Sequence, residues 1–471
     1  MITLDRRTLL ASSPLLLAGQ SLPALAAPTG HSLPGFYADV EKRTFDFFWE
    51  RANRRNGLVP DRWPTPSFSS IAAVGFALTA YPLGVERGWV HRSEARDLTL
   101  TTLRFFWSAP QGPQPSGTSG HAGFFYHFLD METGLRFRTN ELSSVDSTLL
   151  FLGVLFAGAW WDGDHPAERE IRRLAAAIYA RADWNFFRSD GRRALSMGWH
   201  PEQGLIDRDW TGYNEGMMVN ILALGAPVHA GPSDLWSSWT APYDKDWRGS
   251  GPTRHIAFAP LFGHQYSHVW IDFRGIRDGV MREAGFDYFE NSRRATYANR
   301  AWCIANPMGW AGYSRDTWGL TACDGPASVT LPYRGHPATF YGYSARGPVS
   351  MPDGRDDGTI APTAALGSLP FAPEIVIPCA AAMLKRPGLY GRYGYRDSFN
   401  PSFTDTAAKV ETGSVDPRRG WIATDWLGID QGPILLQAAN HRSEFVWRTM
   451  RKVPAIRLGL QRAGFRGGWL G

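Results

Sequence analysis

The stretch TGYNEGMMVNILALG, residues 211–225, joins a polar loop to an apolar segment that has the residue spacing of a helix. Thr211 and Asn214 are both good N-cap residues, so the pattern predicts a helix over about 214–224 with Glu215 in its first turn. Apolar helical segments broken by loops rich in Gly, Pro and Trp recur along the chain. This arrangement indicates a mostly helical protein.

Other segments show the same helical spacing. They lie at about 36–47, 71–78, 92–107, 143–161, 166–187, 258–282, 286–304, 361–384 and 430–448. Long loops at 108–140, 226–256, 325–360 and 401–428 are expected to carry any strands and the function. Neighbouring helices on short connections suggest stacked helical hairpins. We therefore predict an all-α fold, and a closed toroid would follow from the helix count and the chain length.

The first residues have the features of an export signal. Arg6 and Arg7 precede a leucine-rich run, and Ala24 and Ala26 are spaced like a signal-peptidase site. The arginine pair is similar to a twin-arginine signal. We expect residues 1–26 to be removed, leaving one domain at 27–471 in the periplasm or outside the cell. The apolar run is shorter than the roughly 20 residues of a membrane span, so no stable membrane association is expected.

Composition limits the classes of partner and cofactor. The formal net charge is +5, and the basic residues are scattered rather than grouped, which argues against nucleic acid as a partner. Three cysteines, Cys303, Cys323 and Cys379, allow at most one disulfide, and whether Cys303 and Cys323 pair stays open. His264 and His268 are four residues apart but lack an HExxH motif, and nucleotide-binding fingerprints are absent. We predict no metal and no cofactor.

Tryptophan is the most informative residue type. The chain has 20 tryptophans and 13% aromatic residues, many beside Gly, Asp, Asn or Glu, as in WWDGD, MGWHPEQG and TDWLGID. A sugar needs an aromatic ring for its C–H face and hydrogen-bonding partners for its hydroxyls. A core of large hydrophobic residues explains part of this composition, but it does not explain the polar neighbours.

Seven motifs in order resemble one family. They are ELSSVDSTLLFLG (141–153), MGWHPEQG (197–204), WTGYNEGMMVNILALG (210–225), PLFGHQYSHVWIDFRG (260–275), WGLTACDGP (318–326), DGTIAPTAALGSLPFAPE (357–374) and GIDQGPILL (428–436). The family is that named putative glucoamylase, which corresponds to glycoside hydrolase family 144 and its close relatives. The resemblance covers about residues 36–466. It implies an (α/α)6 barrel and inverting hydrolysis of β-1,2-glucans, often to sophorose.

Glu215 and Asp430 are the candidate catalytic pair. Each precedes an apolar helix, where a carboxylate can also be merely structural. The resemblance implies that Glu215 is the general acid, and it makes Asp430 the candidate base. A helix N-terminus lowers the pKa of a carboxyl group, so burial or a neighbouring carboxylate must raise that of Glu215. Glu141 is the second choice for the acid, or a hydroxyl-binding residue.

The remaining candidates would bind substrate. Ser143 and Asp146 resemble a capping box with Asp in place of Glu, so the alternative to substrate binding for Asp146 is a structural role at a helix start. The alternative for Asp324 is a structural role in a turn. The candidate stacking residues are Trp199, Trp210, Tyr213, Trp318 and Trp426, and the candidate hydroxyl partners are Asp146, His264, Gln265, Arg274 and Asp324.

Two other functions stay open. Helical toroids also host polysaccharide lyases, which need a base and a means of neutralising a uronate. A non-catalytic glucan-binding protein would keep the aromatic cleft but would not need three acidic residues. The sequence leaves open the oligomeric state, endo or exo action, and the choice of linear or cyclic glucan.

Overall fold

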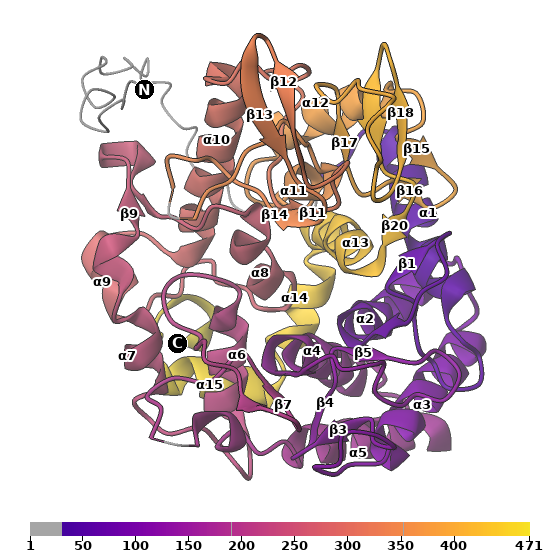
Figure 1. Ribbon diagram of the computed structural model, residues 1–471. Helices are drawn as coiled ribbons and strands as arrows, with labels where there is room; N and C mark the ends of the chain where they lie inside the picture. Colours follow the sequence, from indigo (N-terminus) through magenta and orange to yellow (C-terminus); the bar gives the residue numbers. More distant parts are fainter. Residues whose placement is uncertain (1–30, 190, 352) are drawn as a thin grey trace.

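The computed structural model describes residues 31–189, 191–351 and 353–471 (Figure 1). The predicted export signal at residues 1–26 lies outside these ranges. The longer helices are α1 (Phe36–Arg51), α2 (Ile71–Glu86), α3 (Arg92–Ser108), α4 (Ser144–Trp160), α5 (Pro166–Ala180), α6 (Gly216–Gly225), α10 (Tyr288–Ala305), α12 (Pro373–Leu384), α13 (Gly428–Ser443) and α15 (Pro454–Arg462). The shorter ones are α7 (Leu235–Thr240), α8 (Tyr266–Trp270), α9 (Gly279–Ala284), α11 (Pro362–Leu366) and α14 (Phe445–Met450).

These helices form the predicted (α/α)6 barrel. The inner helices α2, α4, α6, α8, α11 and α13 are buried over most or all of their length. Helices α2, α4, α8 and α13 run through the middle of the molecule in Figure 1. Helices α1, α3, α5, α10, α12 and α15 pack outside them.

The inner helices begin at the same end of the barrel. Ser267, in the first turn of α8, donates from its hydroxyl to the Glu215 carbonyl oxygen where α6 begins, with 3.5 Å between the oxygens. Thr363, in the first turn of α11, likewise donates to the Asp430 carbonyl oxygen in α13, at 3.2 Å. Residues at the starts of these helices therefore gather at one end, as the family resemblance implied.

Helices α2 and α4 approach each other through two glycines. A Cβ on Gly75 would lie 2.2 Å from the Leu149 carbonyl oxygen, and one on Gly153 would lie 2.1 Å from the Gly75 carbonyl oxygen. Both distances are far inside van der Waals contact, so the two backbones pack with no side chain between them. This contact fixes the separation of two inner helices.

Short strands lie between the helices. Among them β1 (Arg62–Trp63) pairs with β20 (Trp426–Leu427), and β2 (Ser69–Ser70) pairs with β5 (Phe128–Leu129). Strand β6 (Leu142–Ser143) pairs with β7 (Gly198–His200), which also pairs with β8 (Gly204–Leu205). A longer hairpin joins β12 (Val329–Tyr333) to β13 (His336–Phe340).

The remaining strands pair locally or across neighbouring loops. They are β3 (Gly120–His121), β4 (Phe124–Phe125), β9 (Trp247–Arg248), β10 (His255–Ile256), β11 (Ala322–Cys323), β14 (Ser344–Ala345), β15 (Tyr390–Gly391), β16 (Gly394–Tyr395), β17 (Phe399–Asn400), β18 (Ser414–Asp416) and β19 (Gly420–Ile422). The long loops predicted at 108–140, 226–256, 325–360 and 401–428 carry some of these strands. The prediction is wrong for the strands outside those loops, which are β1, β2, β6, β7, β8, β11, β15, β16 and β17.

The prediction of one helix over 258–282 is wrong. The chain forms a short 3₁₀ turn at Leu261–His264, then α8, and after an extended stretch α9. The break follows Trp270, where the Asp272 carboxylate pairs with Arg274 and Arg451. The predicted helix at 361–384 is likewise divided into α11 and α12, and α7 and α15 were not predicted.

Two further observations bear on the predictions. Cys303, Cys323 and Cys379 are all free and buried, so Cys303 and Cys323 are not paired. In the described ranges, no helix has both the length and the hydropathy to cross a bilayer.

Candidate active site

Glu215 occupies the start of α6. It is the N-cap residue itself rather than a first-turn residue, and the Asn214 side-chain oxygen accepts the Gly216 N–H at 2.9 Å. Its Oε2 is buried without a hydrogen-bond partner among the described residues. Burial raises the pKa of Glu215 to about 7, with a further increase from Asp146 and an opposing effect from Arg208. Burial thus opposes the lowering of the Glu215 pKa by the helix N-terminus, and Glu215 can hold a proton near neutral pH.

Asp430 lies in the first turn of α13 and faces a second carboxyl group, that of Asp397. Burial, followed by the charge and hydrogen bond of Asp397, raises the pKa of Asp430 well above its ordinary value. Burial also raises the pKa of Asp397, whose Oδ2 accepts the Asp324 N–H at 2.7 Å and the Ser398 hydroxyl at 3.0 Å. Two buried carboxyl groups in contact cannot easily both ionise. The charge and hydrogen bond of Asp397 therefore make it harder for Asp430 to ionise.

His127 joins Glu141 and Asp146. Its Nδ1 lies 2.8 Å from Glu141 Oε1, and its Nε2 lies 3.5 Å from Asp146 Oδ1. Burial opposes the charge on His127, but the two carboxylates outweigh it and raise the pKa of His127 to about 9. The Glu141 pKa is lowered, because the hydrogen bond and charge of His127 outweigh burial. Glu141 is thus a poor proton donor, which opposes its role as second-choice acid.

Asp146 has the predicted structural role at the start of α4. The Ser143 hydroxyl oxygen accepts the Asp146 N–H at 3.1 Å as the N-cap of α4, and the same hydroxyl donates to Asp146 Oδ2 at 2.6 Å. Its other oxygen faces His127. The donor atoms of His127, Glu141 and Asp146 lie within 4.8 Å of one another, close enough to share a cation. A protonated imidazole already pairs with both carboxylates, so it reduces the repulsion between them.

Arg62 holds a third group of carboxylates. Its guanidinium donates to Asp61 at 3.1 Å and to Asp324 at 2.8 Å, and it lies 3.7 Å from Asp425. Burial, then the charge of Asp397, raises the pKa of Asp324 to about 7 against the opposing effect of Arg62. Asp324 therefore lies beside the Asp397–Asp430 pair, where the family motif implied a substrate contact.

Two tyrosines connect these groups. Burial raises the pKa of Tyr266, and the charges of Asp430, Glu215 and Asp146 raise it further, so the phenol lies near all three carboxylates. Tyr343 is 63% exposed, and it lies near Asp430, Asp397 and Asp61. The structure therefore brings the carboxyl groups of Glu215, Asp430 and Asp146 around the Tyr266 phenol, and we call this region the acidic cleft.

The predicted stacking surface needs correction. Trp210, Tyr213, Trp318 and Trp426 are buried, so none offers a free ring face to a sugar. Trp210 instead supports the start of α6: its Nε1 donates to the Ser144 hydroxyl at 2.8 Å, and a Cβ on Gly216 would lie 2.7 Å from its ring. Tyr213 stacks on Tyr288.

Trp199 is only partly buried. It packs against His121 and Phe186, with centroid distances of 5.1 and 5.6 Å. It lies on β7, directly opposite Leu142 of β6, the residue after Glu141.

Three predicted hydroxyl partners are engaged elsewhere. His264 is buried, with Nε2 accepting the Phe258 N–H at 3.2 Å, and the Gln265 amide donates to Ala364 and Ser368 at 2.7 Å. Arg274 pairs with Asp272 and with Glu444, which caps the far end of α13. At a rise of about 1.5 Å per residue, the 16 residues of α13 place that end about 24 Å from its start. Arg274 is therefore remote from the cleft.

Sequence reasoning missed several residues of the cleft. They are Asp61, Arg62, His127, Tyr266, Tyr343, Asp397 and Asp425. Most lie on loops or at strand ends, where no periodic pattern marks them. Tyr266 and Asp425 were within stretches already quoted, PLFGHQYSHVWIDFRG and TDWLGID, so their polar neighbours were the available signal.

Comparisons with known proteins agree with this geometry. An exo β-1,2-glucooligosaccharide sophorohydrolase (non-reducing end) of Parabacteroides distasonis is 26% identical over 456 residues, covering 90% of this chain. The chain spans 57% of that relative's length.

Two solved structures match over nearly the whole fold. A putative glucoamylase from Bacteroides uniformis has 29% identity and a TM-score of 0.77, covering 92% of this chain and 98% of that one. The endo-β-1,2-glucanase from Chitinophaga pinensis, solved with sophorotriose and glucose, has 25% identity and a TM-score of 0.76, with the same coverage.

The family model described as "Putative glucoamylase" matches residues 207–454, more than half of the chain and the segment from Glu215 to Asp430. With the barrel and the acidic cleft, this match establishes that the chain belongs to the putative glucoamylase family.

Proposed function

We propose that this protein is an exported glycoside hydrolase that cleaves β-1,2-glucans to sophorose or short oligosaccharides. The family membership, the similarity to a sophorohydrolase and the similarity to an endo-β-1,2-glucanase support this substrate class. The observation that carries the proposal is the position of Glu215, whose buried Oε2 has no hydrogen-bond partner among the described residues and whose pKa burial raises to about 7. A protein that only binds glucan has no need of a carboxyl group that keeps its proton.

The proposed reaction uses two carboxyl groups. Glu215 gives its proton to the oxygen of the glycosidic bond as that bond breaks, which releases the leaving sugar as an alcohol. Water attacks the anomeric carbon from the opposite face and gives its proton to Asp430, which inverts the configuration. Asp430 accepts this proton in its ionised form, which burial and the neighbouring Asp397 disfavour because both raise the pKa of Asp430.

The other charged groups suit the transition state. The anomeric carbon develops positive charge as the bond breaks, and the ionised Glu141 beside His127 supplies negative charge in the same cleft. The positive charges of His127 and Arg62 reduce the repulsion among the carboxylates when the cleft is empty.

Product analysis tests the proposal. Purified residues 27–471 are incubated with linear β-1,2-glucan, and the products and their anomers are followed by NMR. We expect sophorose or short β-1,2-oligosaccharides, with the α-anomer first. A β-anomer formed first would contradict inversion. Unsaturated products from uronate polymers would support a lyase, and tight glucan binding without turnover would support a binding protein.

Export is tested separately. The proposal rests on Arg6, Arg7 and the Ala24–Ala26 site in residues 1–26. Replacing Arg6 and Arg7 together by lysine should retain the protein in the cytoplasm if the twin-arginine route is used. Unchanged export would point to another route.

A further inference from the structure

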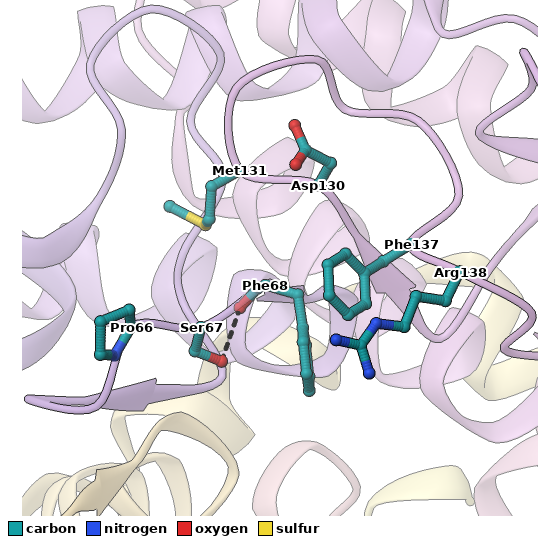
Figure 2. Close-up of a pocket in the computed structure, with 7 residues that line it drawn as sticks. All are labelled: Pro66, Ser67, Phe68, Asp130, Met131, Phe137 and Arg138. Atoms are coloured by element: carbon teal, nitrogen blue, oxygen red, sulfur yellow. Dashed lines mark hydrogen bonds between the residues drawn. The ribbon is translucent and has the colours of Figure 1, made fainter.

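A cavity of 340 Å³, drawn in Figure 2, is lined by none of the carboxylates described above. Two segments line it: Pro66, Ser67 and Phe68 before β2, and Asp130, Met131, Phe137 and Arg138 between β5 and β6. Figure 2 shows the rings of Phe68 and Phe137 side by side, with the Arg138 guanidinium next to them. The four residues of the second segment that line the cavity belong to the loop at 108–140, which was expected to carry part of the function.

Direct contacts connect this cavity to the charged residues of the cleft. The ring centroids of Phe137 and Phe68 are 4.8 Å apart, those of Phe68 and Phe128 are 4.1 Å apart, and those of Phe128 and His127 are 3.8 Å apart. His127 then pairs with Glu141. The Asp61 N–H also donates to the Phe68 carbonyl oxygen at 2.8 Å. The cavity thus continues the wall that carries His127 and Asp61.

The chemistry of the lining fits one unit of a neutral sugar. Phe68 and Phe137 are partly exposed and line the cavity, unlike the buried tryptophans. Asp130 accepts three hydrogen bonds through Oδ1, from the N–H groups of Glu132 and Thr133 and from the Thr133 hydroxyl. Oδ2 accepts no hydrogen bond among the described residues and remains available to a hydroxyl.

Arg138 is the most exposed charged group of the lining. It has a φ of 54°, in the left-handed region that a residue with a side chain rarely adopts. Within the described ranges it has no ion pair, and its guanidinium lies 5.1 Å from the Phe137 ring centroid. Arg138 and Asp130 together carry no net charge, which favours a neutral ligand over an anion. The volume lies within the range of about 300–1,000 Å³ typical of small-molecule sites.

We propose that this cavity binds a glucosyl unit of the glucan chain, away from the bond that is cleaved, and so favours long substrates. The inference rests on the proposed function, because the glucan chain must pass through the neighbouring cleft. Phe68 and Phe137 pack against the sugar face, while Arg138 and Asp130 bind its hydroxyls. Short oligosaccharides that fill only the cleft do not reach the cavity.

A matched pair of variants tests this site. Arg138→Gly removes the guanidinium and accommodates the positive φ. Arg334→Gly makes the same change at another exposed arginine, with a φ of 49°, in the turn of the β12–β13 hairpin. We expect Arg138→Gly to raise KM about tenfold for long β-1,2-glucooligosaccharides, since it removes charged hydrogen bonds, and to leave KM for trimers unchanged. Arg334→Gly should change neither, and kcat should stay constant.

Loss of the aromatic ring that packs against the sugar should likewise raise KM only for long oligosaccharides. Phe137→Leu keeps an apolar side chain but removes the ring, and it should also raise KM only for long substrates. Equal effects on short and long substrates, or no effect in either Arg138→Gly or Phe137→Leu, would overturn the inference. A crystal structure of Glu215→Gln soaked with a long oligosaccharide should show a glucosyl unit against Phe68, and an empty cavity beside an occupied cleft would also overturn it.

A failure of the proposed glucan site can be distinguished from a failure of the proposed function. If wild-type protein cleaves no β-1,2-glucan, binding of β-1,2-, β-1,3- and β-1,4-glucooligosaccharides is measured by calorimetry for wild type and both arginine variants. Weaker binding only in Arg138→Gly would keep the cavity as a glucan site while the proposed activity fails. Equal binding in all three proteins, or none, would overturn the site itself.

Discussion

His127 Nδ1 lies 2.8 Å from Glu141 Oε1, and this contact gives the two residues opposite and stable charges. The pKa of His127 is raised to about 9 while that of Glu141 is lowered, so both remain ionised at neutral pH. The contact therefore makes the protonation state of Glu141 differ from that of Glu215, whose pKa of about 7 lets it carry a proton. Two glutamates in one cleft have different protonation states because only one of them has a histidine partner.

Replacement of His127 should change how stability depends on pH. Its pKa is higher in the folded protein, about 9, than the ordinary value of 6.5, so its stabilising effect is complete below about pH 6.5 and is lost as the pH rises through 9. His127→Gln should lack this dependence and should be less stable at pH 6 than wild type. Urea unfolding at pH 6, 7.5 and 9 measures it. His229→Gln, at an exposed position, is the control, and parallel pH curves for His127→Gln and wild type would contradict the prediction.

Glu215→Gln should abolish most activity without unfolding the protein. The amide has nearly the same shape but cannot donate the proton, so kcat should fall by at least about 10²-fold, as loss of a general acid predicts. Its stability should be equal or higher, because the variant no longer buries an ionisable group. Kinetics and urea unfolding of the same sample distinguish a chemical effect from a folding defect, and a fully active variant would exclude Glu215 as the acid.

The pH profile of wild type should reflect the same group. The acid must be protonated, and the pKa of Glu215 is raised to about 7, so kcat/KM should decrease as the pH rises above about 7. Steady-state rates on β-1,2-glucan between pH 5 and 9 measure this limb. A profile that stays flat through pH 8.5 would be inconsistent with proton donation by Glu215.

Asp397→Asn should shift the acidic limb of the pH profile of kcat/KM. Asp397 raises the pKa of Asp430, and the base must be ionised, so activity rises with pH as the pair loses its proton. Without the Asp397 charge, the pKa of Asp430 decreases and the acidic limb shifts to lower pH. Asp430→Asn should instead lower kcat by at least about 10²-fold at every pH. An unshifted acidic limb in Asp397→Asn would show that the two carboxyl groups titrate independently.

Gly75→Ala should destabilise the barrel. The added methyl group would lie 2.2 Å from the Leu149 carbonyl oxygen, so α2 and α4 must separate, at a cost of about 1–3 kcal/mol in the free energy of unfolding. This cost opposes the gain of about 1 kcal/mol that alanine usually brings to a helix. Gly35→Ala, where a Cβ meets nothing within 4 Å, is the control in urea unfolding. Equal urea midpoints for the two variants would show that α2 and α4 can move apart without a loss of stability.

Sequence patterns predicted the parts of this protein that are periodic or follow a helix start. The helices at 71–78 and 92–107 were found, although α2 continues to Glu86. Glu215 and Asp430 were identified because each precedes an apolar helix and lies in a family motif. Patterns failed where tertiary contacts decide: Asp272 interrupts the expected helix by pairing with arginines, and Asp397 acquires its importance from Asp430, 33 positions away in the sequence.

Aromatic residues were the least well interpreted. Polar neighbours suggested that Trp210, Trp318 and Trp426 face a sugar, but all three are buried. The ring nitrogens of Trp210 and Trp426 donate to Ser144 and Gly394, which are far from them in the sequence. Exposure of a ring depends on packing that the residue type does not reveal. Tyr343, which is exposed near Asp430, had no such distinguishing neighbours.

The inner ring is uneven, and this asymmetry suggests where the barrel can adapt. Helices α2, α4 and α13 have 16, 17 and 16 residues, and α2 and α4 are in backbone contact, whereas α8 and α11 have only five residues each. Short helices contribute fewer packed turns, so their side of the ring should deform at lower energetic cost. Among relatives, we expect the geometry around α2 and α4 to vary least, and changes in the width of the barrel to arise around α8 and α11.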